Sequence, residues 1–193
     1  MRPMLICYVL WAAFYVLWLV WALWLKRTER RDLGLIYHVH RVLVIAGFVL
    51  IFYKFPGHWL HQRVLPQALW LDALGIAITV IGFAFAIWAR SYLGRNWSSG
   101  VTSKVQHELI RTGPYRWVRH PIYTGLLTAI FGTVLVQGEA RSLLALPLLY
   151  IGWKMKSRLE ERMMTGTFGG DYTAYANSVG AIFPRMKKAT AGK

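Results

Sequence analysis

The sequence predicts an all-α, polytopic integral membrane protein with about five transmembrane helices. Hydrophobic residues make up 56% of the 193 residues and charged residues only 16%, against about 45–50% and about 25% in soluble domains. The apolar residues form long runs, and most of the formal net charge of +15 lies between them. This composition excludes a disordered chain and fits a nucleic-acid-binding protein poorly, whereas a lipid-embedded core with basic ends accounts for both features. We therefore expect membrane lipids, and no nucleic acid, as partners.

The first apolar segment, residues 4–25, contains no charged side chain. A helix of about 20 residues crosses the hydrocarbon core of a bilayer. The apolar core of a signal peptide is shorter and is followed by a small-residue cleavage site, whereas Lys26 and Arg27 follow here. We therefore expect a transmembrane helix that is retained in the mature protein.

The second apolar segment, residues 33–55, carries His38, His40 and Arg41 near its start. We expect these side chains at the membrane interface, where a long basic side chain can extend to water. Pro56-Gly57 then ends the helix.

Three further segments complete the predicted set. Residues 68–89 carry a single charge, Asp72, near the start, where it can face headgroups or water. Residues 122–138 and 142–163 are separated by a short polar break and predict a helical hairpin across the bilayer. From Lys154 onward the second arm is charged, so we expect it to emerge from the bilayer as a continuous helix.

Basic residues are unevenly distributed between the two sides that five spans create. Lys and Arg gather in residues 26–31, in residues 90–119 and from Lys154 onward, whereas the alternate ends carry few. The positive-inside rule then places the N-terminus outside and the C-terminus in the cytoplasm. Segments 90–121 and 154–193 become the cytoplasmic, catalytic part of a single membrane domain covering residues 1–193.

The first of these cytoplasmic segments carries polar motifs. Gly113-Pro114 predicts a tight turn directly before Tyr115. Pro121 suits the first turn of the following helix, which places Arg119 and His120 at its N-terminus. An anionic ligand or headgroup is favoured there. The same two side chains also suit a simple interfacial anchor.

The second segment carries paired carboxylates, Glu160 and Glu161, in a basic surround close to the predicted membrane edge. Such a pair can hold a cationic group. It can equally well pair with Lys156 or Arg158 nearby on the same helix. The residues alone leave both interpretations open.

Several cofactor sites have no counterpart in the sequence. There is no Gly-x-x-x-x-Gly-Lys-Ser/Thr phosphate loop and no Gly-x-Gly-x-x-Gly after a strand. The single cysteine, Cys7, excludes a Cys-based zinc site, and His58 and His61 lack an evident third ligand, so no metal site is predicted. Any cofactor is therefore expected among helix ends and loops at the cytoplasmic face.

The pattern Gly-x-Tyr-x-x-x-Arg-His-Pro-x-Tyr over residues 113–123, with Glu160-Glu161 and Phe168-Gly169 downstream, resembles the isoprenylcysteine carboxyl methyltransferase family. That family belongs to a wider group of membrane methyltransferases that includes phospholipid N-methyltransferases. The resemblance covers roughly the C-terminal half and implies S-adenosyl-L-methionine as methyl donor, bound in a cytoplasmic pocket closed by the C-terminal segment. The donor-binding residues that it implies are His107, Glu108, Leu109, Ile110, Tyr115, His120, Pro121, Ile122, Tyr123 and Glu160.

The resemblance also implies a lipid-like or prenylated acceptor that arrives from the bilayer, with carboxyl O-methylation as the reaction. The family places an arginine for the acceptor carboxylate one turn before Glu160. Here that position is Lys156, with Arg158 nearby, and a lysine binds carboxylates as a point charge and not bidentately. We expect these two residues to bind the substrate.

The nature of the acceptor decides which catalytic groups are needed. A carboxylate acceptor needs a cationic clamp and no base, whereas an ammonium headgroup must lose a proton to a base such as Glu161 or His120. We expect Arg119, His120 and Glu161 to be the catalytic residues, and both acceptor classes stay open.

Two other functions are compatible with the same architecture. Some membrane reductases of sterols and acyl chains look similar near their C-termini, and Arg111, Arg116 and Arg119 can bind the 2′-phosphate of NADPH. A non-catalytic accessory protein that kept the fold is the second alternative. The Arg-His-Pro block combined with Glu160-Glu161 favours the methyltransferase.

Overall fold

Six α-helices and one short strand pair make up the described part of the chain. The computed structural model describes residues 3–23, 28–31, 34–54, 59–94, 102–104 and 109–185. The helices are α1 (Pro3–Ala22), α2 (Leu35–Phe52), α3 (Leu69–Leu93), α4 (Pro121–Gln137), α5 (Ala140–Phe168) and α6 (Gly170–Ser178). Strands β1 (Thr28–Arg31) and β2 (Thr102–Lys104) pair antiparallel, and two 3₁₀ turns are η1 (Trp59–His61) and η3 (Gly113–Arg116).

The predicted all-α class is confirmed, apart from the β1–β2 pair, which the sequence pattern did not indicate. Helices α1, α2 and α3 are each long and apolar enough to cross a membrane. Helix α4 is apolar but has 17 residues, somewhat fewer than the usual span of about 20. Helix α5 has 29 residues, apolar before Lys154 and charged after it. Five spans therefore remain a prediction, with the part of α5 from Lys154 onward outside the membrane.

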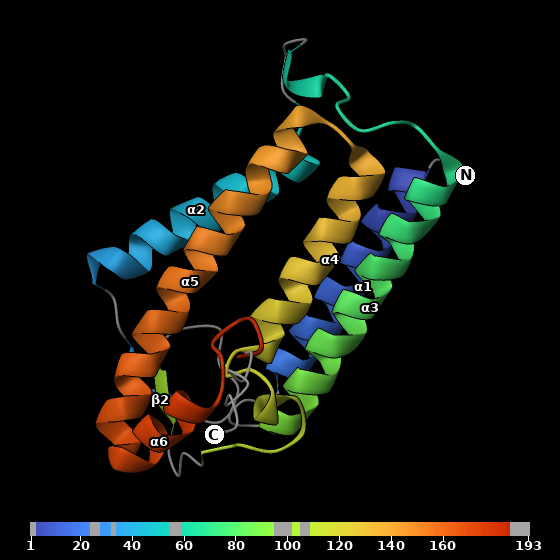
Figure 1. The fold of residues 1–193 in the computed structure, drawn as a ribbon. Coiled ribbons are helices and arrows are strands. Elements are labelled where there is room, and N and C mark those ends of the chain that lie inside the picture. Colours follow the sequence, from blue (N-terminus) through green and yellow to red (C-terminus); the bar gives the residue numbers. More distant parts are fainter. Residues whose placement is uncertain are drawn as a thin grey trace, which may run out of the picture.

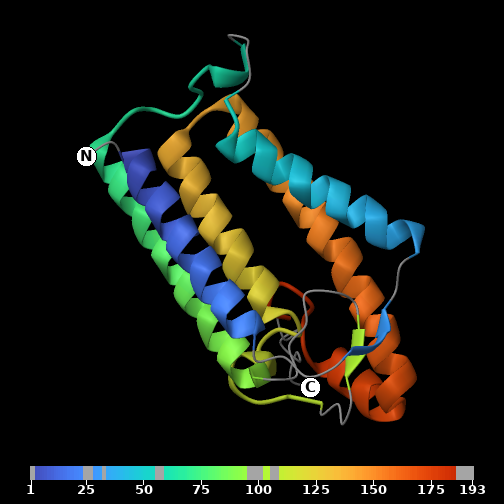
Figure 2. The same cartoon turned by 180° about the vertical axis from the view of Figure 1, so that it is seen from behind.

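The helices form two groups that meet at one end and diverge at the other (Figures 1 and 2). Helices α1, α3 and α4 lie side by side, and α2 packs along α5. Between α4 and α5 the chain turns at Gly138, whose φ of +63° is the left-handed conformation that glycine adopts without strain. We call this junction the hairpin end. At the opposite end, the site end, η3 and α6 lie where the two groups diverge.

Helices α3 and α4 approach closely because glycines face each other along their contact. A Cβ atom added to Gly75 would lie 2.6 Å from the carbonyl oxygen of Gly132, and one added to Gly82 would lie 2.5 Å from that of Gly125. Such small-residue contacts bring helix backbones together in membranes. The recurring glycines of these two segments therefore serve contacts within the chain.

A buried arginine fixes the hairpin end. Arg141 is 2% exposed, and its Nη1 donates to the carbonyl oxygens of Leu50 and Tyr53 at 2.9 and 2.6 Å. Its Nε donates to Glu139 at 2.6 Å, and Glu139 also lies 3.0 Å from His61 Nδ1. The guanidinium thereby satisfies carbonyl groups that the C-terminus of α2 leaves without helical partners. The second histidine of that predicted pair, His58, lies outside the described residues.

The two histidines that are predicted to lie at the membrane interface, His38 and His40, differ in their burial. The side chain of His38 is exposed, whereas His40 is 6% exposed. A Cβ atom on Gly152 of α5 would lie 3.2 Å from the carbonyl oxygen of His40, so the two helices are in close contact there. This contact buries His40, and nothing in the local sequence marks it.

We predict that Gly82→Ala destabilises the protein, because the added methyl group would lie 2.4 Å from the backbone nitrogen of Ala129, which cannot move alone. Overpacking of this kind costs about 1–3 kcal/mol, and about 1 kcal/mol lowers Tm by about 2–4 °C in a chain of this size. Thermal unfolding in detergent measures the change.

Gly166→Ala is the matched control, because a Cβ atom at Gly166 in α5 meets nothing within 4 Å. This variant should unfold at or slightly above the wild-type temperature, since alanine favours a helix over glycine. A wild-type Tm for Gly82→Ala would show that α3 and α4 do not pack at the described distance.

Candidate active site

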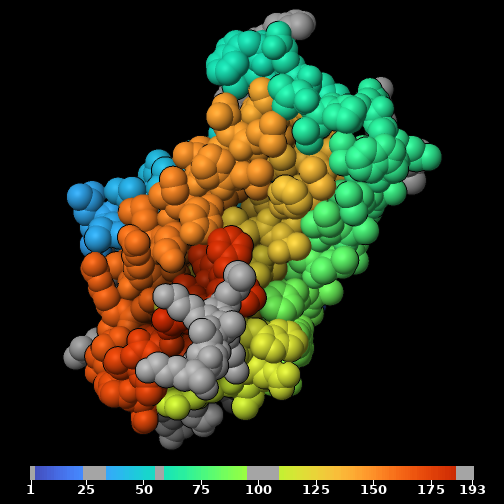
Figure 3. All heavy atoms as spheres, in the orientation of Figure 1, coloured from blue at the N-terminus to red at the C-terminus, as the bar shows by residue number. Residues whose placement is uncertain are grey.

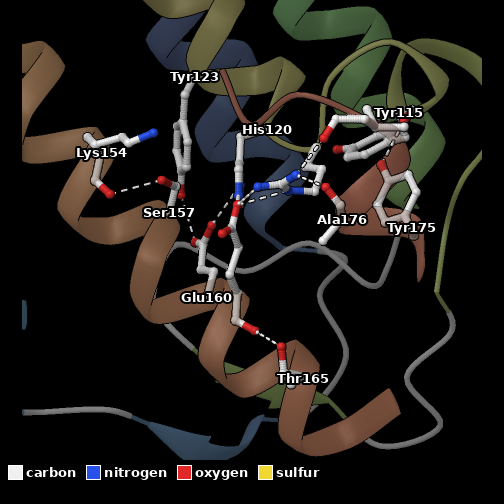
Figure 4. A network of polar contacts seen from close by, with 12 residues as sticks. Tyr115, His120, Tyr123, Lys154, Ser157, Glu160, Thr165, Tyr175 and Ala176 are labelled. Atoms are coloured by element: carbon white, nitrogen blue, oxygen red, sulfur yellow. Dashed lines mark hydrogen bonds and ion pairs between the residues drawn. The ribbon is translucent and has the colours of Figure 1, made fainter. Parts of the chain in front are cut away.

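Polar side chains converge at the site end, where the start of α4 faces the charged half of α5 (Figure 4). The C-terminal segment, residues 179–185, follows α6 and forms the third side of this site, beside α4 and α5. The side chains that meet here, which we call the charged network, are Arg119, His120, Tyr123, Lys156, Glu160 and Glu161.

The backbone around His120 is fixed on both sides. Pro121 occupies the first turn of α4 and leaves His120 as the N-cap residue. The backbone N–H groups of Arg119 and His120 donate to the carbonyl oxygens of Gly180 and Ala181 at 2.8 and 2.9 Å. The C-terminal segment thus pairs with the chain just before α4 and holds the His120 ring in one place.

The imidazole of His120 lies between two carboxylates. Its Nδ1 is 3.4 Å from Glu160 Oε2, and its Nε2 is 3.0 Å from Glu161 Oε1. Both ring nitrogens can donate at once only when the ring is protonated. The His120 side chain is 9% exposed and the two carboxylates are about a quarter exposed, so this contact is largely shielded from water.

Tyr123 and Lys156 extend the network toward the membrane side. The Tyr123 hydroxyl donates to Glu160 Oε1 at 2.6 Å. Its ring stacks against His120 and Trp153, with centroid distances of 5.5 and 6.1 Å. The Lys156 ammonium lies 5.5 Å from the centre of the Tyr123 ring and 3.9 Å from Glu160 Oε1. The Tyr123 ring therefore lies beside both a cation and a carboxylate, an arrangement in which an aromatic ring can attract a positively charged group.

Arg119 joins three parts of the site. Its Nε and Nη2 donate to Glu161 Oε1 at 3.0 and 2.9 Å, and its Nη1 donates to the carbonyl oxygens of Ala176 and Val179. All three groups of the guanidinium are therefore engaged by the protein itself. This geometry positions Glu161 and anchors the end of α6.

Burial and charge act in opposite directions on the ionisable groups of the site. Burial opposes protonation of His120, but Glu160 and Glu161 outweigh it and raise the pKa of His120 above 6.5. Burial favours the neutral form of each carboxyl group, but hydrogen bonds from His120 and nearby cations hold the pKa of Glu160 and Glu161 below 4.5. The network therefore favours an imidazolium between two carboxylates.

Burial lowers the pKa of Lys156, and the carboxylate of Glu160 counteracts this. Because Arg119 and the imidazolium of His120 balance the two carboxylates, any proton on Lys156 makes the network positive.

The other residues expected from the sequence are distributed more widely. Tyr115 is buried, with its hydroxyl donating to the Ala89 carbonyl at 3.4 Å. Pro121 and Ile122 are buried at the start of α4, Leu109 is partly buried, and Ile110 packs against the core. Arg158 is exposed, because it lies two residues from both Lys156 and Glu160 and so on another face of α5. His107 and Glu108 lie outside the described residues.

Two contributors are not among the site residues expected from the sequence. The Tyr175 hydroxyl donates to the Tyr115 carbonyl at 2.6 Å and so ties α6 to η3; its signal in the sequence is the spacing of Tyr172 and Tyr175 after Phe168-Gly169. The carbonyl oxygens of Ala176 and Val179 hold Arg119 through the backbone, and backbone groups leave no mark in a sequence.

Comparison with known proteins places this arrangement in a family. The model of the family described as phospholipid methyltransferase matches residues 70–171, which is more than half of the chain. This chain belongs to the phospholipid methyltransferase family. The matched range includes all of α4 and α5 and all six members of the charged network.

Curated relatives of this family member include isoprenylcysteine methyltransferases. A protein-S-isoprenylcysteine O-methyltransferase of Saccharomyces cerevisiae is 32% identical over 116 residues, 58% of this chain and 48% of that one. The Tribolium castaneum protein of the same name is 28% identical over 75% of this chain and 51% of its own. A cobalt-zinc-cadmium resistance protein of Cupriavidus metallidurans is 30% identical over 74% of this chain and 62% of its own.

A solved structure agrees with these relatives. The eukaryotic intramembrane Ras methyltransferase, isoprenylcysteine carboxyl methyltransferase, matches with a TM-score of 0.55 and 25% identity, over 75% of this chain and 52% of that one. The predicted resemblance to this group, and the assignment to the integral membrane proteins, are thereby confirmed. The chain spans about half the length of the isoprenylcysteine methyltransferases that it matches.

We predict that the charged network gives the protein a stability maximum in mildly acidic solution. The contribution of His120 is complete below its ordinary pKa of 6.5 and is lost as the pH rises through its raised value. The contributions of Glu160 and Glu161 are complete above 4.5 and are lost as the pH falls through their lowered values. Thermal unfolding between pH 4 and pH 9 measures this profile.

In Glu161→Gln the His120 ring keeps one carboxylate of two, so its pKa falls and the alkaline loss of stability becomes smaller. Asp171→Asn is the control, because the pair that Asp171 forms with Arg111 at 3.8 Å is exposed, and exposed pairs contribute little. Parallel profiles for wild type and Glu161→Gln would contradict the coupling of these groups.

Proposed function

We propose that this protein transfers a methyl group from S-adenosyl-L-methionine to the carboxylate of a lipid-like or prenylated acceptor, as in isoprenylcysteine O-methylation. The observation that carries this proposal is the charged network at the start of α4, directly beside an apolar cavity between α4 and α5. Similarity to the isoprenylcysteine methyltransferases supports the reaction class.

The apolar cavity has a volume of about 470 Å³, within the usual range of ligand pockets. Figure 3 shows the face on which α4 and α5 lie beside each other, with the C-terminal segment between them. Thr124 connects the cavity with the network, because its hydroxyl donates to the carbonyl oxygens of His120 and Ile182. The residues that line it are Thr124, Leu127, Thr128, Phe131, Leu146, Pro147, Tyr150 and Phe183.

The residues of the site fit the chemistry of the donor. Its amino group and ribose hydroxyls suit the carboxylate of Glu160, which already accepts from a hydroxyl and faces a cation. Its carboxylate suits the N–H groups of the first turn of α4, which lack helical partners. A sulfonium is attracted to an aromatic face such as that of Tyr123. When bound, the donor supplies a methyl group that is open to nucleophilic attack.

The protein's own contribution is positioning and exclusion of water. Arg119 orients Glu161 and ties down the C-terminal segment, so we propose a positioning role for it within the catalytic set. His120 and Lys156 supply positive charge near the acceptor. Because the network raises the pKa of His120 and lowers the pKa of Glu160 and Glu161, it favours the charge state in which the ring is already protonated and the carboxylates are weaker bases for an ammonium proton. This favours a carboxylate acceptor, which needs no base.

The same proposal includes the topology. With five spans, the distribution of basic residues favours a cytoplasmic site end and an N-terminus outside, according to the positive-inside rule. A lipid-like acceptor can then reach the network laterally through the apolar cavity between α4 and α5.

We predict that the detergent-purified protein binds S-adenosyl-L-methionine, and that Glu160→Gln weakens this binding about ten- to a hundredfold. A hydrogen bond to a charged group contributes about 1.5–3 kcal/mol, and about 1.4 kcal/mol corresponds to a factor of ten. Calorimetry of donor binding, with NADPH measured in parallel, tests the cofactor. Transfer of labelled methyl groups to N-acetyl-S-farnesylcysteine, compared with vesicles of phosphatidylethanolamine, tests the acceptor.

Arg162→Gln is the matched control, because Arg162 lies two residues further along α5 with its side chain exposed. It should bind the donor as the wild type does. Binding of NADPH without S-adenosyl-L-methionine would replace the proposal with a reductase. Donor binding with label found only in phosphatidylethanolamine would replace the carboxylate acceptor with an amine.

A further inference from the structure

One buried polar side chain near the charged network has no partner within it. His40 of α2 is 6% exposed, and neither ring nitrogen has a hydrogen-bond partner among the described residues. Its ring meets the ring of Tyr37 edge-on, at 5.1 Å between centroids, which leaves both nitrogens unsatisfied.

The position of His40 directs it toward the site. Along the contact of α2 with α5, Gly47 faces Leu149 while Val44 and the carbonyl of His40 face Gly152, so the two helices run antiparallel. Helical side chains lean toward the N-terminus of their own helix. The ring therefore leans from the level of Gly152 toward Lys156, one turn further along α5.

The charges around His40 agree with this placement. Lys156 and Glu160 are close enough to act on it electrostatically, as is the neighbouring Arg41 on its own helix. Glu160 is already bonded by Tyr123 and faces His120 and Lys156. Two cations, Lys156 and Arg41, thus act on His40, and the carboxylate that acts on it, Glu160, is engaged by other side chains.

An unsatisfied buried imidazole lowers the stability of a protein, whereas an apolar ring of similar size at the same place does not. Packing against α5 therefore does not explain why this residue is a histidine. A ligand that binds beside it and completes its hydrogen bonds would explain it.

We propose that His40 recognises the acceptor by donating a hydrogen bond to its carboxylate, beside the ammonium of Lys156. The inference rests on the proposed function, because that function defines the acceptor. The two donors come from different helices, α2 and α5, so together they read both the charge and the position of the carboxylate. The N–H of a neutral imidazole donates in one fixed direction. The lysine ammonium acts as a point charge and fixes no such direction.

The test is equilibrium binding of three probes to the full-length protein: N-acetyl-S-farnesylcysteine, its carboxamide, and farnesyl phosphate. The wild type should bind the carboxylate about tenfold more tightly than the carboxamide. In His40→Phe this ratio should become smaller, because only the positive charge near the acceptor then favours the carboxylate, while the affinity for S-adenosyl-L-methionine stays the same. His40→Gln, which keeps an N–H donor, should retain part of the preference.

His38→Phe is the matched control, since His38 lies on the same helix with an exposed side chain, and it should keep the full ratio. Thermal unfolding shows whether each variant is folded. The Tm of His40→Phe should equal or exceed the wild-type value. If the histidine served packing, its replacement would lower the Tm.

An unchanged carboxylate preference in His40→Phe, or no preference in the wild type, would overturn the proposal. Tighter binding of farnesyl phosphate than of the carboxylate would overturn it as well. A His40-dependent preference in a protein that does not bind S-adenosyl-L-methionine would reject the methyltransferase and keep the recognition role. If donor binding, methyl transfer and the carboxylate preference are all unchanged in His40→Phe, the methyltransferase is kept and the recognition role is rejected.

Discussion

The contact of His120 with Glu160 and Glu161 is the interaction on which the site end depends. The two helix groups meet at the hairpin end and diverge from it, so α4 and α5 are linked at the other end by these side chains and by the backbone pairing of residues 119–120 with Gly180 and Ala181. The imidazolium supplies this link at 3.0 and 3.4 Å, and Arg119 extends it to α6 and the C-terminal segment. A neutral ring can donate to only one of the two carboxylates. The charged contacts and the stacking of Tyr123 on Trp153 together therefore keep the diverging helices at a fixed separation.

At the hairpin end, too, a buried charge joins neighbouring helices, but through different residues. Arg141 is buried, and its charge is matched by Glu139 and by carbonyl groups at the end of α2. Between the two charged ends, α3 and α4 are held by glycine contacts that need no charge. Buried charges are costly unless they are paired, and Arg141 and Arg119 lie near helix ends, where backbone carbonyl groups complete their pairing. The apolar middle of the molecule is left to small-residue packing.

The sequence predicted much of this because apolar runs and helix-terminal residues leave strong local signals. All five predicted segments are helices, and Pro121 and Glu160-Glu161 pointed to the network. It could not separate Arg158 from Lys156, because both are basic and only the phase of α5 decides which faces the site. Nor could it show that His40 is buried, because the closeness of α2 to α5 depends on Gly152, more than a hundred residues away. Three other features likewise depend on tertiary structure: the β1–β2 pair, the contacts of Arg119 with backbone carbonyls, and the hydrogen bonds of the Thr124 hydroxyl.

For the proposed methyl transfer, the cavity and the network together restrict the acceptor more than either does alone. An apolar volume of about 470 Å³ binds hydrocarbon without selecting its polar end, and a charged cluster binds anions without selecting their tail. Thr124 belongs to both, since it lines the cavity and bonds the carbonyl oxygen of His120. An acceptor that fills both parts must carry its anionic group directly at the end of its hydrocarbon. A bulky headgroup would separate the tail from the network, so a small carboxylate on an apolar chain fits this geometry better than a phospholipid does.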